Sequence, residues 1–198
     1  GAWVAYQRGP DGNPVSLWIS DTRGASERQL IDSAFFAGDG MADSDNRRVR
    51  DVVWSPDSAT IYFNTTVGEG MGAQAAVDLW RVDPATGAVE RLLADGQGGG
   101  IFPNSDGTQL AVVSPGVYGQ SPGEIALYTV SDGSRRVLLT YDAVATASEW
   151  RWFAAPHWMP GDQEIRVAIP AVETVYGGPA AVTALWSLPL NGSAAQLG

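Results

Sequence analysis

The chain has 198 residues, of which 24 are glycine, 12 are proline and 44% are hydrophobic; this composition excludes disorder and favours many short elements joined by turns. All 12 basic residues are arginine against 22 acidic residues, and a formal net charge of −10 repels phosphate backbones, so no nucleic-acid partner is expected. Cysteine is absent, which excludes disulfides and thiolate metal sites, and no apolar run is long enough for a membrane span.

The first predicted unit, residues 2–33, has three strand-like segments, which read "AWVAYQR", "SLWISDT" and "ERQLIDS". The first segment matches the second strand of the units that follow it. A preceding strand that ends in a Ser-Pro-Asp-like turn is missing. We therefore expect this unit to lack one strand, with unpaired backbone along one edge. We also expect the chain to be an open arc of such units, cut from a larger ring.

The link after this unit contains an acidic segment, residues 38–46. Its oxygen-bearing side chains include those of Asp39, Asp43, Asp45 and Asn46. Such a density of oxygen atoms can hold calcium, but the segment lacks the residue order and the terminal glutamate of an EF-hand. We predict a solvated loop and no tight metal site, with Arg47 and Arg48 beside it available to neutralise the carboxylates.

Three further units are predicted at residues 49–95, 99–141 and 147–198, at a repeat of about 50 residues. Each opens with a strand, a Pro/Asp/Gly turn and a second strand, in the segments "VVWSPDSATIYFNT", "GIFPNSDGTQLAVVS" and "APHWMPGDQEIRVAI". A hairpin follows in "DLWRVDPATGAVERLL", "ALYTVSDGSRRVLL" and "ALWSLPLNGSAAQL". No segment carries a capped helical stripe, so we expect four short strands a unit and almost no helix.

One large aromatic residue falls at the same register of the third strand in every unit. These residues are Trp18, Trp80, Tyr128 and Trp186. Because stacked propeller blades bury both faces of each sheet, we interpret them as packing between blades rather than as ligand contacts. The sequence thus predicts an all-β fold, a β-propeller of about four blades with four antiparallel strands each.

The motif "WSPDSATIYF" followed by "DLWRVDPATG" resembles the TolB-like, WD-repeat-like β-propeller family of bacterial envelope proteins and of the gating propellers of prolyl-oligopeptidase-type peptidases. The resemblance covers residues 1–198 as three full repeats and one partial repeat. It implies a single propeller domain or segment, part of a larger ring because relatives have about six to eight blades, although four blades also fit the length. It also implies an extracytoplasmic location, that is periplasmic, cell-surface or secreted.

The candidate binding residues are aromatic and lie in or near long links expected on one side of the blades: Tyr118, Tyr176, Trp150 and Trp152. The two tyrosines occupy matching places, each in a Val-Tyr-Gly triplet. The two tryptophans share one face of an alternating segment. Exposed aromatic rings suit carbohydrate, peptide or protein contacts. The alternative is that the tyrosines pin their own links and the tryptophans fill a blade interface.

No catalytic residue, metal or cofactor is predicted. His157 is the sole histidine, a Gly-x-Ser-x-Gly elbow is absent, and "GQGGG" at 96–100 lacks the Lys-Ser/Thr of a phosphate loop, so we interpret it as a flexible link. A propeller lyase or glycosidase would need paired carboxylates, for which Asp162 and Glu164 are available.

Two functions from different classes remain. The first is a non-catalytic scaffold that binds a protein, peptide or carbohydrate on the long-link face. The second is the gating propeller of a prolyl-oligopeptidase-type serine peptidase whose catalytic domain lies outside this chain. In either case the open edge and apolar faces favour self-association or pairing with the rest of a larger propeller.

Overall fold

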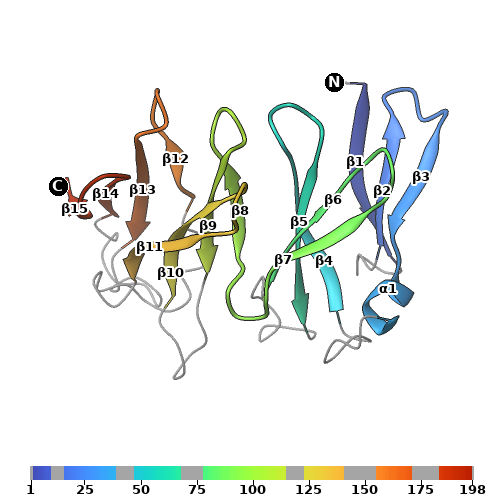
Figure 1. Cartoon of the computed structure of the whole chain (residues 1–198), viewed down its shortest axis with the longest axis horizontal. Helices are drawn as coiled ribbons and strands as arrows, with labels where there is room; N and C mark the ends of the chain where they lie inside the picture. Colours follow the sequence, from blue (N-terminus) through green and yellow to red (C-terminus); the bar gives the residue numbers. More distant parts are fainter. Residues whose placement is uncertain are drawn as a thin grey trace, which may run out of the picture. The chain divides into compact units, whose positions relative to one another are not determined.

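The computed structural model describes residues 2–9, 16–38, 47–67, 78–114, 123–140, 155–170 and 183–197. These ranges contain fifteen strands in four antiparallel sheets and one short helix (Figure 1). The chain divides into two compact units, Gly1–Ile101 and Phe102–Gly198. No helix in the described ranges is long and apolar enough to cross a membrane.

Sheet 1, in the first unit, has three strands in the order β1-β2-β3. Their bounds are β1 Trp3–Arg8, β2 Ser16–Asp21 and β3 Glu27–Ile31. The six-residue helix α1, Ser33–Gly38, follows β3, and the backbone N–H of Phe35 donates to Asp32 Oδ1 at 2.8 Å at its start. The prediction that this unit lacks the first strand of the later units is confirmed for the described part of the chain.

Sheet 2, also in the first unit, has the order β4-β5-β6-β7. Its strands are β4 Arg47–Trp54, β5 Ile61–Val67, β6 Leu79–Val82 and β7 Val89–Leu93. The predicted Ser-Pro-Asp turn joins β4 to β5, and the Asp57 carboxylate accepts hydrogen bonds there from Ser55 Oγ at 2.6 Å and from Ala59 N at 3.0 Å. Between Val49 and Val52 the pairing of β4 with β5 shifts register at a β-bulge.

Sheets 1 and 2 share one apolar core, to which α1 also contributes. Its buried members include Ile19, Phe36, Val49, Phe63 and Trp80. The Trp80 ring stacks on Phe63 with 6.1 Å between ring centroids and meets Phe35 edge-on at 5.4 Å. Trp80 therefore packs between sheets, as its register predicts.

Sheets 3 and 4 have the orders β11-β10-β9-β8 and β12-β13-β14-β15. The strands of sheet 3 are β8 Gly100–Pro103, β9 Gln109–Ser114, β10 Glu124–Thr129 and β11 Arg135–Thr140. Those of sheet 4 are β12 His157–Trp158, β13 Glu164–Pro170, β14 Thr183–Pro189 and β15 Ala195–Gln196. The second unit begins within β8.

A second apolar core lies in the second unit. It includes buried Val113, Ile125, Ile165 and Val167, and Trp186 packs against it. The predicted register of the third strands is confirmed for Trp80 and Trp186, which oppose the equivalent residues Phe63 and Val167, and Trp18 opposes Tyr6 in the same way. It is wrong for Tyr128, which opposes Leu110: counted from the turn between the first two strands, Leu110 is the equivalent of Ile61, and Ala126 occupies the position of Trp80.

Candidate functional site

Tight turns and long links leave each sheet from opposite ends. The tight turns are closed by backbone hydrogen bonds such as Ser55 N to Thr60 O at 2.8 Å and Asn104 N to Gln109 O at 2.9 Å. The long links, residues 39–46, 68–77, 115–122, 141–154 and 171–182, connect strand ends on the other side, because neighbouring strands are antiparallel. In unit 1 the β4–β5 turn and α1 mark these two ends (Figure 1). We call the end of each sheet from which the long links depart its long-link end.

The four predicted binding residues lie outside the described residues. They are Tyr118, Tyr176, Trp150 and Trp152. The acidic segment at 39–46 also lies outside them, so its expected lack of a tight calcium site stays a prediction. What the structure describes is the framework of strand ends from which these links depart.

An ionic network around the buried pair of Arg47 and Asp78 occupies the long-link end of sheet 2. Arg47, 1% exposed, donates from Nη1 to Asp78 Oδ2 at 2.9 Å and to Thr65 Oγ1 at 2.8 Å. Its Nη2 donates to Asp95 Oδ2 at 2.8 Å, and Arg91 donates to the other oxygen of Asp95 at 2.5 Å. Two guanidinium groups thus face two carboxylates, which compensates the cost of burying Arg47.

Asp78 joins β5 to β6 of the same sheet. Its Oδ1 accepts from the backbone N–H of Thr65 at 2.7 Å, and its Oδ2 accepts from the Thr65 hydroxyl and from Trp80 Nε1, both at 2.7 Å. The end of β5, the start of β6 and the indole that fills the core are therefore fixed by one fully buried carboxylate.

Asn64 of β5 forms hydrogen bonds to the β-bulge of β4. Its Oδ1 accepts from Asp51 N at 2.8 Å, and its Nδ2 donates to Asp51 Oδ2 at 2.8 Å and to Gly99 O at 2.6 Å. The bulge leaves a backbone N–H outside the strand ladder, and this side chain satisfies it. Asn64 thereby ties β4 to the link that follows β7.

The glycines of that link are closely packed. Gly98 and Gly99 are buried, and a Cβ atom at Gly98 would overlap the backbone carbonyl of Asp78. The interpretation of residues 96–100 as a flexible link is therefore wrong: the chain uses glycine there for close approach of two backbones.

Sequence reasoning missed most of this network. From its place in the sequence, Arg47 is available to neutralise the acidic segment at 38–46, whereas the structure buries it against Asp78 and Asp95. A usable signal was the carboxylate of "DLW", because the residue two positions before the tryptophan is Ser16 in unit 1 and Ala184 in unit 4. An acidic residue at the start of a buried strand needs a partner of opposite charge.

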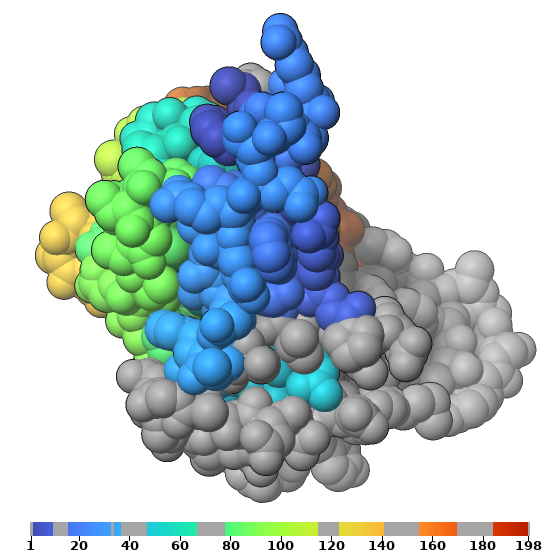
Figure 2. Space-filling model, turned by 90° about the vertical axis from the view of Figure 1, so that its right-hand side faces the viewer, coloured from blue at the N-terminus to red at the C-terminus, as the bar shows by residue number. Residues whose placement is uncertain are grey.

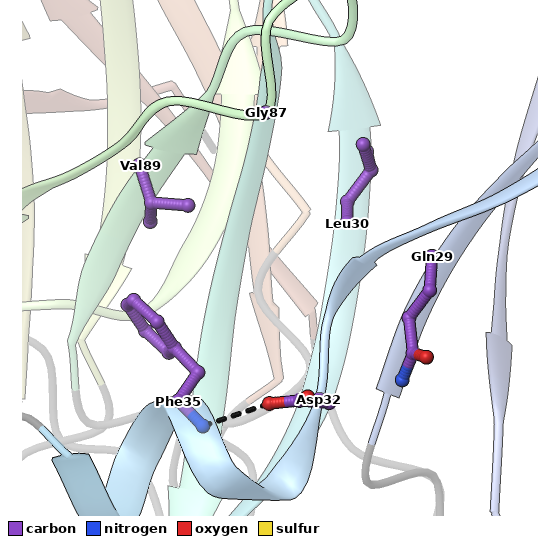
Figure 3. Close-up of a pocket in the computed structure, with 6 residues that line it drawn as sticks. All are labelled: Gln29, Leu30, Asp32, Phe35, Gly87 and Val89. Carbon is purple, nitrogen blue, oxygen red and sulfur yellow. Dashed lines mark hydrogen bonds between the residues drawn. The ribbon is translucent and has the colours of Figure 1, made fainter.

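A shallow hollow of about 560 Å³ lies in unit 1 between β3, α1 and the start of β7. It is lined by Gln29, Leu30, Asp32, Phe35, Gly87 and Val89 (Figure 3). Phe35 and Val89 face each other across it, and the Asp32 carboxylate at its side already accepts the Phe35 N–H. Its lining combines the apolar side chains of Leu30, Phe35 and Val89 with the polar side chains of Gln29 and Asp32, so it favours no particular class of ligand.

The candidate acidic pair of a lyase is engaged in structural bonds. Asp162 Oδ2 accepts from Ser105 N at 3.0 Å, and Glu164 Oε1 accepts from Arg166 Nε at 2.8 Å and from Ser187 Oγ at 2.9 Å. The hydrogen bonds from Arg166 and Ser187 lower the pKa of Glu164, which favours a carboxylate over a proton donor. His157 is exposed on β12, and the described ranges hold no group of three acidic or histidine side chains arranged for a metal ion.

The sheets, their order and their repeat register define a β-propeller fold. It is the TolB-like form of that fold: the chain is similar to TolB from Acinetobacter baumannii, with a TM-score of 0.59 and 15% identity over 99% of this chain and 41% of that chain. The β-propeller domain of the Trilobed protease from Pyrococcus furiosus gives a TM-score of 0.60 and 14% identity over 100% of this chain and 54% of that chain. A prolyl endopeptidase gives a TM-score of 0.63 and 13% identity over 100% of this chain and 28% of that chain.

These similarities confirm the predicted fold, and at such identities they show the fold alone. The chain spans about half the length of TolB and of the Trilobed protease propeller, and less of the prolyl endopeptidase. No protein-family model matches the sequence, and no curated protein matches it either.

Proposed function

We propose that residues 1–198 are one propeller segment that acts as a non-catalytic scaffold and binds a protein, peptide or carbohydrate at the long-link ends of its sheets. The observation that carries the proposal is the ionic network at such an end of sheet 2, in which Arg47 and Asp78 are buried and Asp95 is exposed. A binding surface made of links needs fixed strand ends beneath it, and the buried pair of Arg47 and Asp78 provides them.

Aromatic side chains are the proposed contacts, because the links carry Tyr118, Tyr176, Trp150 and Trp152. Flat rings stack on sugar faces and on peptide groups at a small cost in conformational entropy. The proposed location is extracytoplasmic, and it rests on the resemblance of the repeats to envelope propellers.

The test is selection of ligands from a random dodecapeptide phage library and from a panel of oligosaccharides, followed by affinity measurement on two variants. In the first, the four aromatic residues are replaced by alanine. In the matched control, Arg23→Ala and Gln163→Ala remove exposed side chains at tight turns. We expect ligands that lose at least about tenfold in affinity for the first variant and bind the control normally. Ligands that bind both variants equally, or no ligand at all, contradict the proposal.

A gating propeller of a serine peptidase is the second candidate, and the similarity to a prolyl endopeptidase supports it. The sequence of the complete polypeptide separates the two. An α/β-hydrolase segment with a Gly-x-Ser-x-Gly elbow in the same polypeptide supports gating, and its absence supports the scaffold.

A further inference from the structure

The last strands of sheets 1, 2 and 3 share one irregularity. In each of these sheets the pairing of the last two strands shifts register at one place, where the last strand contains one residue more than its partner. That residue is a leucine in all three sheets, and it directly follows the residue opposite Trp18, Trp80 or Ala126. The three leucines are Leu30 in β3, Leu92 in β7 and Leu138 in β11. The irregularity is thus a β-bulge that recurs at equivalent positions of the repeat.

Burial along the three strands follows one pattern. Two consecutive exposed residues precede each leucine, the leucine is half-buried, and the residue after it is buried. Consecutive side chains of a regular strand point to opposite faces. Leu30 nevertheless packs against the core that contains Ile31, and Leu138 packs against the core that contains its neighbour Leu139. The bulge therefore turns a second apolar side chain toward the core, where a regular strand would point it away.

These strands are also the outer edges of their sheets, because within the described ranges β3, β7 and β11 each pair with one strand only. In sheet 3, Thr129 N donates to Ser134 O at 2.9 Å, and the direction of the backbone groups alternates along an antiparallel ladder. The N–H and C=O groups of Arg135 and Val137 therefore point away from β10. In Figure 2 atoms of the segments around β3, in blue, and around β7, in green, lie at the surface. Such an edge is a template for the addition of another strand.

Each outer strand has a straight half before the bulge and an apolar half that begins with it. The straight halves of β3 and β7 carry exposed charges, which include those of Arg28 and Glu90. The apolar halves are Leu30-Ile31, Leu92-Leu93 and Leu138-Leu139. Charged side chains and bulges both oppose the addition of a strand to a sheet edge. The bulge lies where the charges end, so the apolar half does not extend the straight edge.

We infer that the repeated bulge is a guard of the outer edges, which prevents a second copy of this chain from adding its own outer strand to them. Without the bulge, each straight edge would continue into an apolar segment that suits such pairing. The guard has its largest effect in β11, because Val137 is 41% exposed there, whereas the equivalent residues of β3 and β7 are Gln29 and Arg91.

Deletion of Leu138 tests the guard. The pairs on either side of the bulge, Val137 with Ala126 and Leu139 with Ile125, then follow each other directly, as in a regular ladder. Because the ladder stays in register, we expect an unchanged far-UV circular dichroism spectrum. We expect self-association at least about tenfold tighter than that of the unaltered 198-residue chain, measured by sedimentation velocity over a range of protein concentrations.

Two variants separate the edge from a general loss of stability. Leu138→Ala removes the leucine side chain from the core but keeps the bulge, and we expect it to associate no more than the unaltered chain. Val137→Lys in the chain that lacks Leu138 places a charge on the straightened edge, and we expect it to restore the behaviour of the unaltered chain. The added lysine also brings the net charge of −10 closer to zero, which by itself favours association. Recovery is therefore an effect of the edge and not of net charge.

Deletion of Leu92 gives a comparison within the same chain. Its straight half keeps the exposed Glu90 and Arg91, so we expect weaker association than after deletion of Leu138. The inference is overturned if the folded chain without Leu138 associates no more than the unaltered chain, if Leu138→Ala associates equally, or if Val137→Lys does not reduce association. The first criterion applies to the chain without Leu92 if only that variant retains its β-sheet spectrum. Loss of this spectrum in both deletion variants also overturns the inference, because the bulge would then be needed for the fold itself.

Discussion

Trp18 and Trp80 occupy the same repeat position in neighbouring sheets, yet their surroundings differ. Trp80 is 2% exposed, stacks on Phe63 and donates its indole N–H to the buried Asp78. Trp18 is half-buried, donates to Ser16 Oγ at 3.0 Å and is covered by the guanidinium of Arg8, 4.8 Å from the ring centroid. The repeat therefore specifies the orientation of the indole, whereas the neighbouring sheet and local charges decide how deeply it is buried.

The residue two positions before the tryptophan extends this comparison to a third sheet. It is Asp78 in sheet 2, Ser16 in sheet 1 and Ala184 in sheet 4. The first two accept the indole N–H, while Trp186 Nε1 is buried and has no acceptor in the described part of the chain. The acceptor is thus a local property of each blade and not of the repeat.

Replacing Trp80 by alanine should have the largest effect. It removes a ring from the shared core of sheets 1 and 2, for which we expect a loss of about 3–5 kcal/mol in the free energy of unfolding. Trp18→Ala should cost about half of that or less, because part of the ring is already in water. Urea unfolding followed by far-UV circular dichroism measures both. Equal losses would show that the two positions are equivalent in spite of their exposure.

Replacing Asp78 by alanine should cause the next largest loss in the free energy of unfolding. It leaves Arg47 buried with Asp95 as its remaining described carboxylate partner and takes the acceptor from Trp80, so we expect a loss of about 3 kcal/mol. Glu90→Ala is the matched control, since it breaks the exposed ion pair with Arg81 in the same sheet and should cost less than about 1 kcal/mol. A small effect of Asp78→Ala on the free energy of unfolding in urea would show that the network does not stabilise this end of sheet 2.

Ala184→Ser should stabilise sheet 4 by about 0.5–1.5 kcal/mol, because its hydroxyl can accept the Trp186 indole N–H as Ser16 accepts that of Trp18. The measurement is the shift of the urea midpoint. The same substitution in a Trp186→Phe background should give no gain. A gain that persists without the indole would contradict this explanation.

The smallest effect concerns acid. Hydrogen bonds from Tyr6 and then from Arg8 lower the pKa of Glu27 below its ordinary value of 4.5. Its contribution to stability is therefore present above that ordinary value and is lost as the pH falls through the lower value of the folded state. Glu27→Gln should reduce the slope of unfolding free energy against pH in acid. Asp57 and Asp106, whose pKa values are lowered mainly by hydrogen bonds from Ser55 and Thr108, should retain the rest of the slope. An unchanged slope would show that the ion pair with Glu27 does not hold the Arg8 guanidinium over the Trp18 ring.

The strands were predictable because their signals are local. Turn residues such as Asp57, the β-branched and aromatic run at residues 61–63 and the alternation around Trp80 specify tight turns and strands without knowledge of distant partners. The network at the long-link end was not predictable in the same way. Arg47, Asp78 and Asp95 are far apart in sequence, and the position of Asp78 is Ser16 in sheet 1 and Ala184 in sheet 4, so only the folded sheet brings the three charges together.

The side-chain bond from Asn64 to Gly99 O has a consequence for the order in which the chain folds. Asn64 already holds Asp51, thirteen positions earlier, but Gly99 lies 35 positions later. During synthesis, the hydrogen bond from Asn64 to Gly99 O therefore forms only after all four strands of sheet 2 have left the ribosome. The amide proton of Asp51, which the same side chain shields, reports this closing step: its exchange with deuterated solvent slows when residue 99 arrives.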